Sequence, residues 1–156
     1  MRNFTGFVAM LLLFASCNTT ISREETKTSK LPIEGTWKLL TGTLVEKGDT
    51  TVTDYTKGKE FIKIINATHF AFLSHDLNKG KDSATAEYSS GGGTYTLNDD
   101  AYTENLEYCS AREWEGNSFN FIITINNDTL IQQGVEKIDS LGVNRINTEK
   151  YVRVKN

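Results

Sequence analysis

The chain of 156 residues carries 17 basic and 20 acidic side chains, which gives it a net charge of −3. This balance argues against nucleic-acid binding, which needs a concentrated basic surface, and against adhesion to anionic lipids through a polybasic patch. The length is sufficient for one domain that buries about two thirds of its unfolded surface without cross-links.

The N-terminus has the layout of a secretory signal peptide, with Arg2 before an apolar stretch over residues 7–14. That stretch is well short of the ~20 residues that a membrane-spanning helix needs. The following ending FASC resembles the bacterial lipobox, in which the cysteine becomes the lipidated first residue of the mature chain. We expect a signal peptide over residues 1–16 and acyl chains such as palmitate at Cys17, with ordinary secretion as the alternative. Lipidation would anchor the protein to the outer membrane of the cell envelope, on its periplasmic or surface face.

Residues 17–32 are rich in Thr, Ser and charged residues and end at the only proline, Pro32. This composition is typical of a flexible tether. If Cys17 is lipidated, Cys109 has no cysteine with which to form a disulfide within the chain. We therefore expect the fold to rest on its core and Cys109 to be a small buried hydrophobic residue.

From Ile33 onward, short runs of β-branched and aromatic residues alternate with Gly, Asn and Asp, as in strands and turns. Eight strands are predicted, over residues 36–45, 59–65, 69–75, 93–97, 101–109, 118–125, 129–135 and 146–155. Most connections are short and rich in turn residues, so neighbouring strands should pair antiparallel. The stretch 76–92, which contains SSGGG, is expected to be a mobile loop. Because closure hides sheet edges, residues 33–156 are predicted to form an all-β, eight-stranded antiparallel up-and-down barrel.

Alternation along the strands predicts which side chains share a face. In the strand 118–125, Phe119 and Phe121 lie on one side, and in the strand 101–109 Tyr102, Glu104 and Tyr108 lie together. An eight-stranded barrel has an interior that is either filled by side chains or holds one small ligand.

Glu104 is the carboxylate of most interest, because an ionised Glu in an apolar barrel interior is costly unless it is paired. If its face points inward, a partner or a ligand is expected. The candidate partners are hydrogen-bond donors: Arg112, Arg145, His69, His75 and the tyrosine hydroxyls. If the face points outward, Glu104 is an ordinary surface charge.

The stretch EGTWKLL places Gly35, Thr36 and Trp37 at the start of the first predicted strand. This pattern resembles the Gly-x-Trp signature of lipocalins, in which the Trp plugs one end of the barrel and an Arg from the last strand lies across it. The matching residue here is Arg153, in EKYVRVK. The resemblance implies a structural role in barrel closure for Trp37 and Arg153, with a cation–π attraction of roughly 0.5 to 2 kcal/mol.

The wider pattern runs from GTWKLL through THFAF and GGGTYTLNDDAYTENLEY to EKYVRVK. It resembles the lipocalin-like domain of Bacteroidota lipoproteins, a family of unknown function, over roughly residues 33 to 155. The resemblance implies a lipocalin-like barrel.

The main functional hypothesis is a membrane-anchored protein that binds a small, hydrophobic or amphipathic ligand in the barrel cavity. Its predicted lining residues are Tyr102, Glu104, Tyr108, Phe72, Phe119 and Phe121. The alternative is a structural or interaction module with a filled barrel, which meets another protein of the envelope. An enzyme that uses Glu104 as an acid or base is a third hypothesis.

Neither a catalytic motif nor a cofactor motif is found in the sequence. His69 and His75 share a strand face but lie roughly 20 Å apart by strand rise, so they cannot bind one metal ion. No metal, cofactor or nucleic-acid partner is expected.

Overall fold

A computed structural model of the chain describes residues 31–155. The predicted signal peptide, Cys17 and the predicted tether up to residue 30 lie outside the described residues, so the expectations about them stay predictions. Within residues 31–155, no helix has both the length and the apolar character required to cross a membrane.

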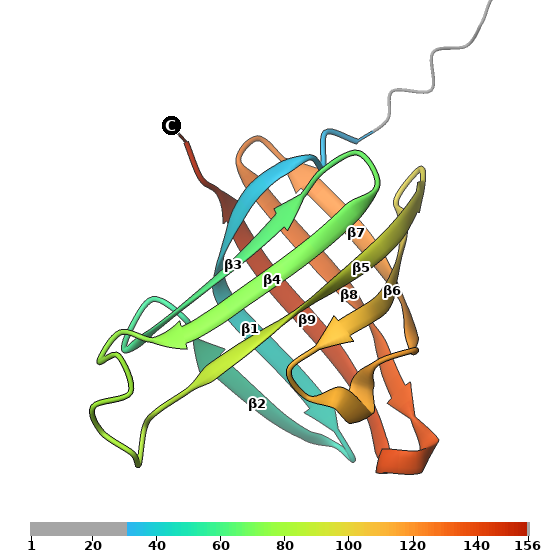
Figure 1. Cartoon of the computed structure of the whole chain (residues 1–156). Helices are drawn as coiled ribbons and strands as arrows, with labels where there is room; N and C mark the ends of the chain where they lie inside the picture. The colour runs from blue at the N-terminus through green and yellow to red at the C-terminus, as the bar shows by residue number, and fades with distance from the viewer. Residues whose placement is uncertain (1–30, 156) are drawn as a thin grey trace, which may run out of the picture.

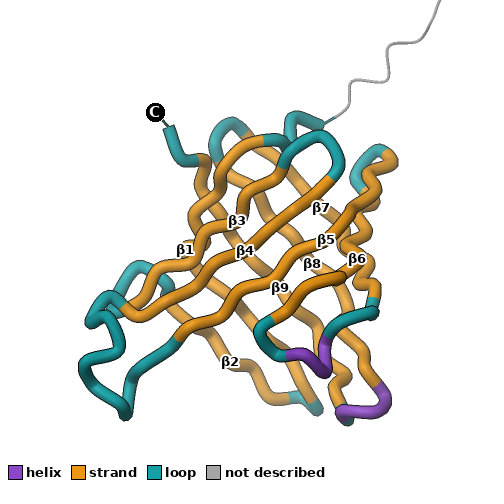
Figure 2. The backbone as a smooth tube through the Cα atoms, viewed as in Figure 1, coloured by secondary structure: helices purple, strands orange, loops and turns teal. Residues whose placement is uncertain are grey.

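Strands and tight turns make up nearly all of the described part of the chain (Figures 1 and 2). The elements are β1 (Gly35–Glu46), β2 (Asp49–Asp54), β3 (Lys59–Ile65), β4 (His69–Asp76), β5 (Tyr88–Asn98), β6 (Ala101–Cys109), η1 (Arg112–Trp114), β7 (Ser118–Asn126), β8 (Thr129–Ile138), η2 (Asp139–Leu141) and β9 (Val143–Arg153). Every strand pairs antiparallel with the next one in the sheet, and β1 also pairs with β9, which closes the sheet. The prediction of an all-β, eight-stranded antiparallel up-and-down barrel is confirmed, with β2 as an extra strand.

Strand β2 has no counterpart among the predicted strands. β3 pairs with β1 only from Gly35 to Lys38, whereas residues 41–46 of β1 pair with β2. Lys47 and Gly48 connect β1 and β2 with φ angles of 51° and 90°, the left-handed values that a two-residue type I′ turn needs. β2 therefore covers the part of the β1 edge that β3 leaves free.

Strand β5 begins at Tyr88, earlier than predicted, so that residues 89–92 belong to a strand and not to a loop. The glycines in this stretch allow close packing. A Cβ atom on Gly93 would stand 1.9 Å from the backbone oxygen of Asn105 on β6, and one on Gly91 would stand 2.6 Å from the ring of Phe72. The expectation of a mobile loop over residues 76–92 is thereby corrected to a loop over residues 77–87.

The start of β1 and the end of β9 lie at the same end of the barrel (Figure 1). Trp37 and Arg153 pair at this end. Trp37 is fully buried, and its indole N–H donates a hydrogen bond of 2.8 Å to the backbone oxygen of Ile33. The guanidinium of Arg153 lies over the indole, 4.0 Å from the ring centre. It also donates hydrogen bonds to the backbone oxygens of Glu34 and Pro32. We call this end of the barrel the closed end.

The core fills the barrel interior next to the closed end. Its fully buried large side chains are Trp37, Tyr102, Tyr151, Ile33, Leu39, Ile123 and Leu130. Ile33 comes from the segment before β1, and the others come from the half of their strands that lies nearest Trp37. A hollow space in the barrel is therefore confined to the opposite half.

Candidate functional site

A cavity of about 240 Å³ lies in the half of the barrel that faces η1 and η2, and we call that end the open end. Along the strands, the cavity reaches from the mouth of the open end to a polar floor above the core. Its lining residues are Phe61, Lys63, Phe72, Ser89, Glu104, Leu106, Cys109, Ala111, Trp114, Phe119, Phe121, Gln132, Glu136, Arg145, Asn147 and Glu149. The barrel is neither empty nor filled throughout, since packed core occupies one half and this cavity the other.

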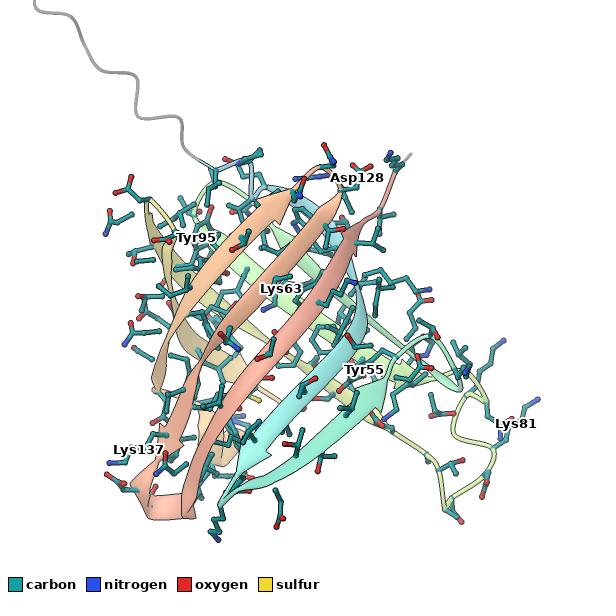
Figure 3. The ribbon with its side chains drawn as sticks, turned by 180° about the vertical axis from the view of Figure 1, so that it is seen from behind. Tyr55, Lys63, Lys81, Tyr95, Asp128 and Lys137 are labelled. Carbon is teal, nitrogen blue, oxygen red and sulfur yellow. The ribbon has the colours of Figure 1, made fainter. Side chains whose placement is uncertain are left out.

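The floor of the cavity is a buried polar cluster of Lys63, Glu104, Gln132 and Glu149, which we call the floor cluster. The Lys63 ammonium donates hydrogen bonds to Glu104 Oε1 at 2.8 Å and to Gln132 Oε1 at 3.1 Å. It lies 3.6 Å from Glu149 Oε2, which also accepts a hydrogen bond of 2.7 Å from the Tyr151 hydroxyl. The side chains of Lys63 and Glu104 are only 3% and 9% exposed. Figure 3 shows Lys63 inside the barrel, between the closed end near Asp128 and the open end near Lys137.

Strand register brings the floor cluster together from four strands. Lys63 comes from β3, Glu104 from β6, Gln132 from β8 and Glu149 from β9. Gln132 and Glu149 are direct partners in the β8–β9 ladder, while Lys63 and Glu104 face each other across the barrel interior. The cluster therefore exists only when the barrel is closed.

Burial and charge shift the pKa values of the Lys63–Glu104 pair. Burial alone would lower the pKa of Lys63, but the attraction of Glu104 and Glu149 outweighs it, and the pKa rises above its ordinary value. The pKa of Glu104 is also raised, because burial and the nearby Glu149 together exceed the stabilisation that Lys63 provides. Lys63 therefore stays charged, whereas Glu104 takes up a proton more readily than an exposed Glu.

A second ionic group, the mouth cluster, lies closer to the open end and consists of Glu136, Arg145 and Asn147. Arg145 Nε and Asn147 Nδ2 each donate a hydrogen bond of 2.7 Å to the Glu136 carboxylate. The Arg145 guanidinium also lies 5.2 Å from the ring centre of Trp114 in η1. Glu136 is thus neutralised by its own neighbours, and Arg145 joins β9 to η1 at the mouth.

Aromatic and aliphatic side chains form the remaining wall of the cavity. Phe61 and Phe72 stack with ring centres 5.6 Å apart, and Trp114 packs at 5.9 Å from Phe119. Leu106 also lines the cavity. The site therefore combines an apolar wall with a charged floor.

Four of the six predicted lining residues line the cavity: Phe72, Glu104, Phe119 and Phe121. Tyr102 points inward but belongs to the core, fully buried and outside the cavity lining. Its hydroxyl makes no hydrogen bond with any described residue. Burial and the charge of Glu104 raise the Tyr102 pKa far above its usual range, so the hydroxyl keeps its proton.

Tyr108 lies outside the barrel, with 68% of the residue exposed, so the prediction that it lines the cavity was wrong. The reason is an irregularity between β5 and β6. Gly92 pairs with Tyr108 but Gly93 pairs with Leu106, which leaves Glu107 without a partner. The extra residue is a β-bulge, and it reverses the in–out alternation beyond Leu106. Cys109 consequently lines the cavity as a half-buried residue.

The arginine and histidine partners expected for Glu104 are not the ones it has, whereas among the expected tyrosines Tyr102 lies close enough to lower the Glu104 pKa. Arg112 is paired with Glu115, Arg145 is paired with Glu136, and both histidines are exposed on β4. The actual partner, Lys63, carried a signal in the sequence FIKII, where it occupies the same parity as Phe61 and Ile65. A lysine at an inward position predicts a buried charge of the sign that Glu104 needs.

Among residues 31–155, no three His, Cys, Asp or Glu side chains are grouped as a metal site would require. The cavity can therefore be described by its own side chains: donors and acceptors that hold each other on the floor, and rings along the wall. No model of a known protein family matches the chain, and no curated protein matches it either.

Proposed function

We propose that the chain is a lipid-anchored lipoprotein of the cell envelope whose barrel binds a small amphipathic ligand. The observation that carries the binding part is the cavity of about 240 Å³, walled by rings and floored by buried charge. The Gly-x-Trp pattern at residues 35–37 supports it, since it resembles that of lipocalins. The lipobox-like residues 14–17 support the anchor.

Cavity size limits the ligand. A cavity of roughly 150 Å³ accepts benzene, and pockets for drug-sized molecules begin at roughly 300 Å³. The volume of about 240 Å³ therefore suits a molecule between these sizes. A molecule of two or three rings, or one medium alkyl chain, lies between benzene and a drug-sized ligand.

Cavity polarity refines the expectation of a largely apolar ligand. Phe61, Phe72 and Trp114 offer apolar contact. An apolar group that reached the floor would cover its charged groups without hydrogen-bonding to them, which costs free energy. A ligand with one apolar part and one polar end satisfies both surfaces. The alternative of an interaction module with a filled barrel agrees with the closed half alone, since the other half is hollow.

Binding is tested with the full-length chain and the neutral dye N-phenyl-1-naphthylamine, whose fluorescence rises in apolar surroundings. We expect saturable binding of one dye per chain. The matched variant is Ala111→Phe, which adds a ring to the cavity lining and should weaken binding of the dye. Phe added in place of Ala71, on the exposed outer face of β4, should leave binding unchanged. The binding proposal fails if the dye shows no saturable site.

The anchor is tested separately by expressing the full-length chain and its Cys17→Ser variant in a bacterial host. The wild-type protein should partition with membranes and carry the added mass of acyl chains, whereas the variant should not. Equal partitioning without added mass in the wild type would contradict lipidation.

A further inference from the structure

We infer that the polar end of the ligand is a protonated primary amine, which the floor cluster binds through Glu104 and Glu149. This inference rests on the proposed function, because it names the chemical class of the ligand for the same cavity. It follows from the charges, the free acceptors and the depth of the floor cluster.

The first step is charge. The floor cluster contains two carboxylates, Glu104 and Glu149, and one ammonium group, Lys63. The mouth cluster is balanced within itself, because Glu136 is paired with Arg145. One negative charge on the floor is therefore without a cation among the described residues. A buried charge of this kind favours either a proton or a cationic ligand.

The second step concerns hydrogen bonds. Lys63 has three donors, and three acceptors surround it, on Glu104, Gln132 and Glu149. The contacts with Glu104 and Gln132 are hydrogen bonds, and the contact with Glu149, at 3.6 Å, is an ion pair. By contrast, Glu104 Oε2 and Glu149 Oε1 accept no hydrogen bond from a described residue. The unused charged groups of the floor are therefore carboxylate oxygens, and an N–H donor with positive charge matches them.

The third step is depth. On β3, Phe61 lies two residues closer to the open end than Lys63, and on β6 Leu106 lies two residues closer than Glu104. Two residues correspond to roughly 7 Å along a strand. An amine at the floor would therefore leave its apolar part beside the rings of Phe61 and Trp114. Glu149 is the more accessible of the two carboxylates, with 15% of its side chain exposed.

An anionic ligand fits the same cavity poorly. Among the described lining residues, the cationic donors are Lys63, which is surrounded by acceptors on the floor, and Arg145 at the mouth. A carboxylate bound to Arg145 would place the apolar tail of the ligand next to the floor cluster. The apolar tail would then cover the charged groups of the floor without hydrogen-bonding to them, which costs free energy. The cavity thus favours a cationic group at the floor, beside Glu104 and Glu149, and an anionic group only at the mouth, beside Arg145.

The test compares four compounds with one alkyl chain, octylamine, octyltrimethylammonium, octanol and octanoate, by displacement of N-phenyl-1-naphthylamine and by calorimetry at neutral pH. We expect octylamine to bind most tightly. Octyltrimethylammonium carries the charge without N–H donors and should bind less well. Loss of one charged hydrogen-bond acceptor in Glu149→Gln should weaken octylamine roughly ten- to a hundredfold.

Glu104→Gln provides a second, independent variant in case one of them folds poorly. Glu60→Gln is the matched control, because Glu60 is a carboxylate outside the cavity, paired with Lys38. It should leave octylamine binding unchanged. If octanoate or octanol binds as tightly as octylamine, the inference of an amine ligand is overturned. Saturable binding of the dye would in that case still support the proposed ligand-binding function. Absence of binding by the dye and by all four compounds would overturn the proposed function as well.

Discussion

Arg153 and Trp37 are direct partners in the β9–β1 ladder, and the guanidinium of Arg153 lies 4.0 Å from the centre of the Trp37 ring. The first and last strands of the barrel meet at this pair. The same guanidinium binds the backbone oxygens of Glu34 and Pro32, the residues that lead into β1. One side chain therefore joins the beginning of the barrel to its end.

Replacing Arg153 should weaken the closed end of the barrel. Arg153→Ala removes the cation–π contact and two charge-assisted hydrogen bonds, so the free energy of unfolding should fall by about 1–3 kcal/mol. Arg153→Lys keeps the charge but lacks the planar guanidinium, so its free energy of unfolding should lie between those of the wild type and Arg153→Ala. Urea denaturation measures the effect. Equal stability of Arg153→Ala and the wild type would contradict a closing role.

Removing Lys63 should destabilise the barrel strongly, because it leaves buried carboxylates without a cation. Lys63→Met is expected to lower the free energy of unfolding by about 3–5 kcal/mol. The double variant Lys63→Met, Glu104→Gln should recover part of this loss, since one unpaired charge is removed.

The control for Lys63→Met is Lys38→Met, which breaks the half-exposed pair with Glu60. That pair should contribute about 0–1 kcal/mol. Chemical denaturation of the four proteins checks both values. Similar costs for Lys63→Met and Lys38→Met would show that the floor cluster is not buried in solution.

Glu104 should make stability depend on pH. Its pKa in the folded protein is raised above the ordinary value of 4.5, mainly by burial, so the folded state binds the proton more tightly than the unfolded state does. The Glu104 carboxyl therefore adds to the free energy of unfolding below pH 4.5, and this contribution is lost as the pH rises through its pKa in the folded protein. The charged or titratable groups facing it are Lys63 on β3, Tyr102 on β6 and Glu149 on β9.

The measurement compares the wild type with Glu104→Gln by urea denaturation from about pH 4 to 8. Glu104→Gln has no carboxyl to titrate at this position, so it should gain stability relative to the wild type as pH rises. The difference should grow by at most about 1.4 kcal/mol per pH unit. A constant difference over the whole range would exclude a raised pKa for Glu104.

Gly93 should tolerate no side chain, because a Cβ atom there would lie 1.9 Å from Asn105 O and 2.8 Å from Glu107 N. Gly93→Ala forces β5 and β6 apart at the bulge and should cost about 3 kcal/mol or more. Gly116→Ala is the matched control: Gly116 has a φ of 80° but no atom near its missing Cβ. It should cost about 1–2 kcal/mol from backbone strain alone. Thermal unfolding of both variants separates close packing from conformational freedom.

Several strands and shared faces could be predicted from the sequence because they depend on local pattern. Alternation put Phe119 and Phe121 on one face and Glu104 on the face of Tyr102, and the structure turns both faces inward. Alternation failed at Tyr108, since a bulge against Gly92 and Gly93 changes the parity and depends on how β5 meets β6. The strand β2 was missed because it forms to cover an edge that only the length of β1 relative to β3 exposes.

By itself, the sequence determined the class of fold and which side chains share a face of a regular strand, because side-chain direction alternates along a strand. Only the tertiary structure decided which face points inward and what its residues meet. Lys63 and Glu104 are 41 residues apart, and the closed barrel brings their charges to 2.8 Å. Barrel closure and register are long-range properties, and they set both the filled half around Trp37 and the hollow half above the floor cluster.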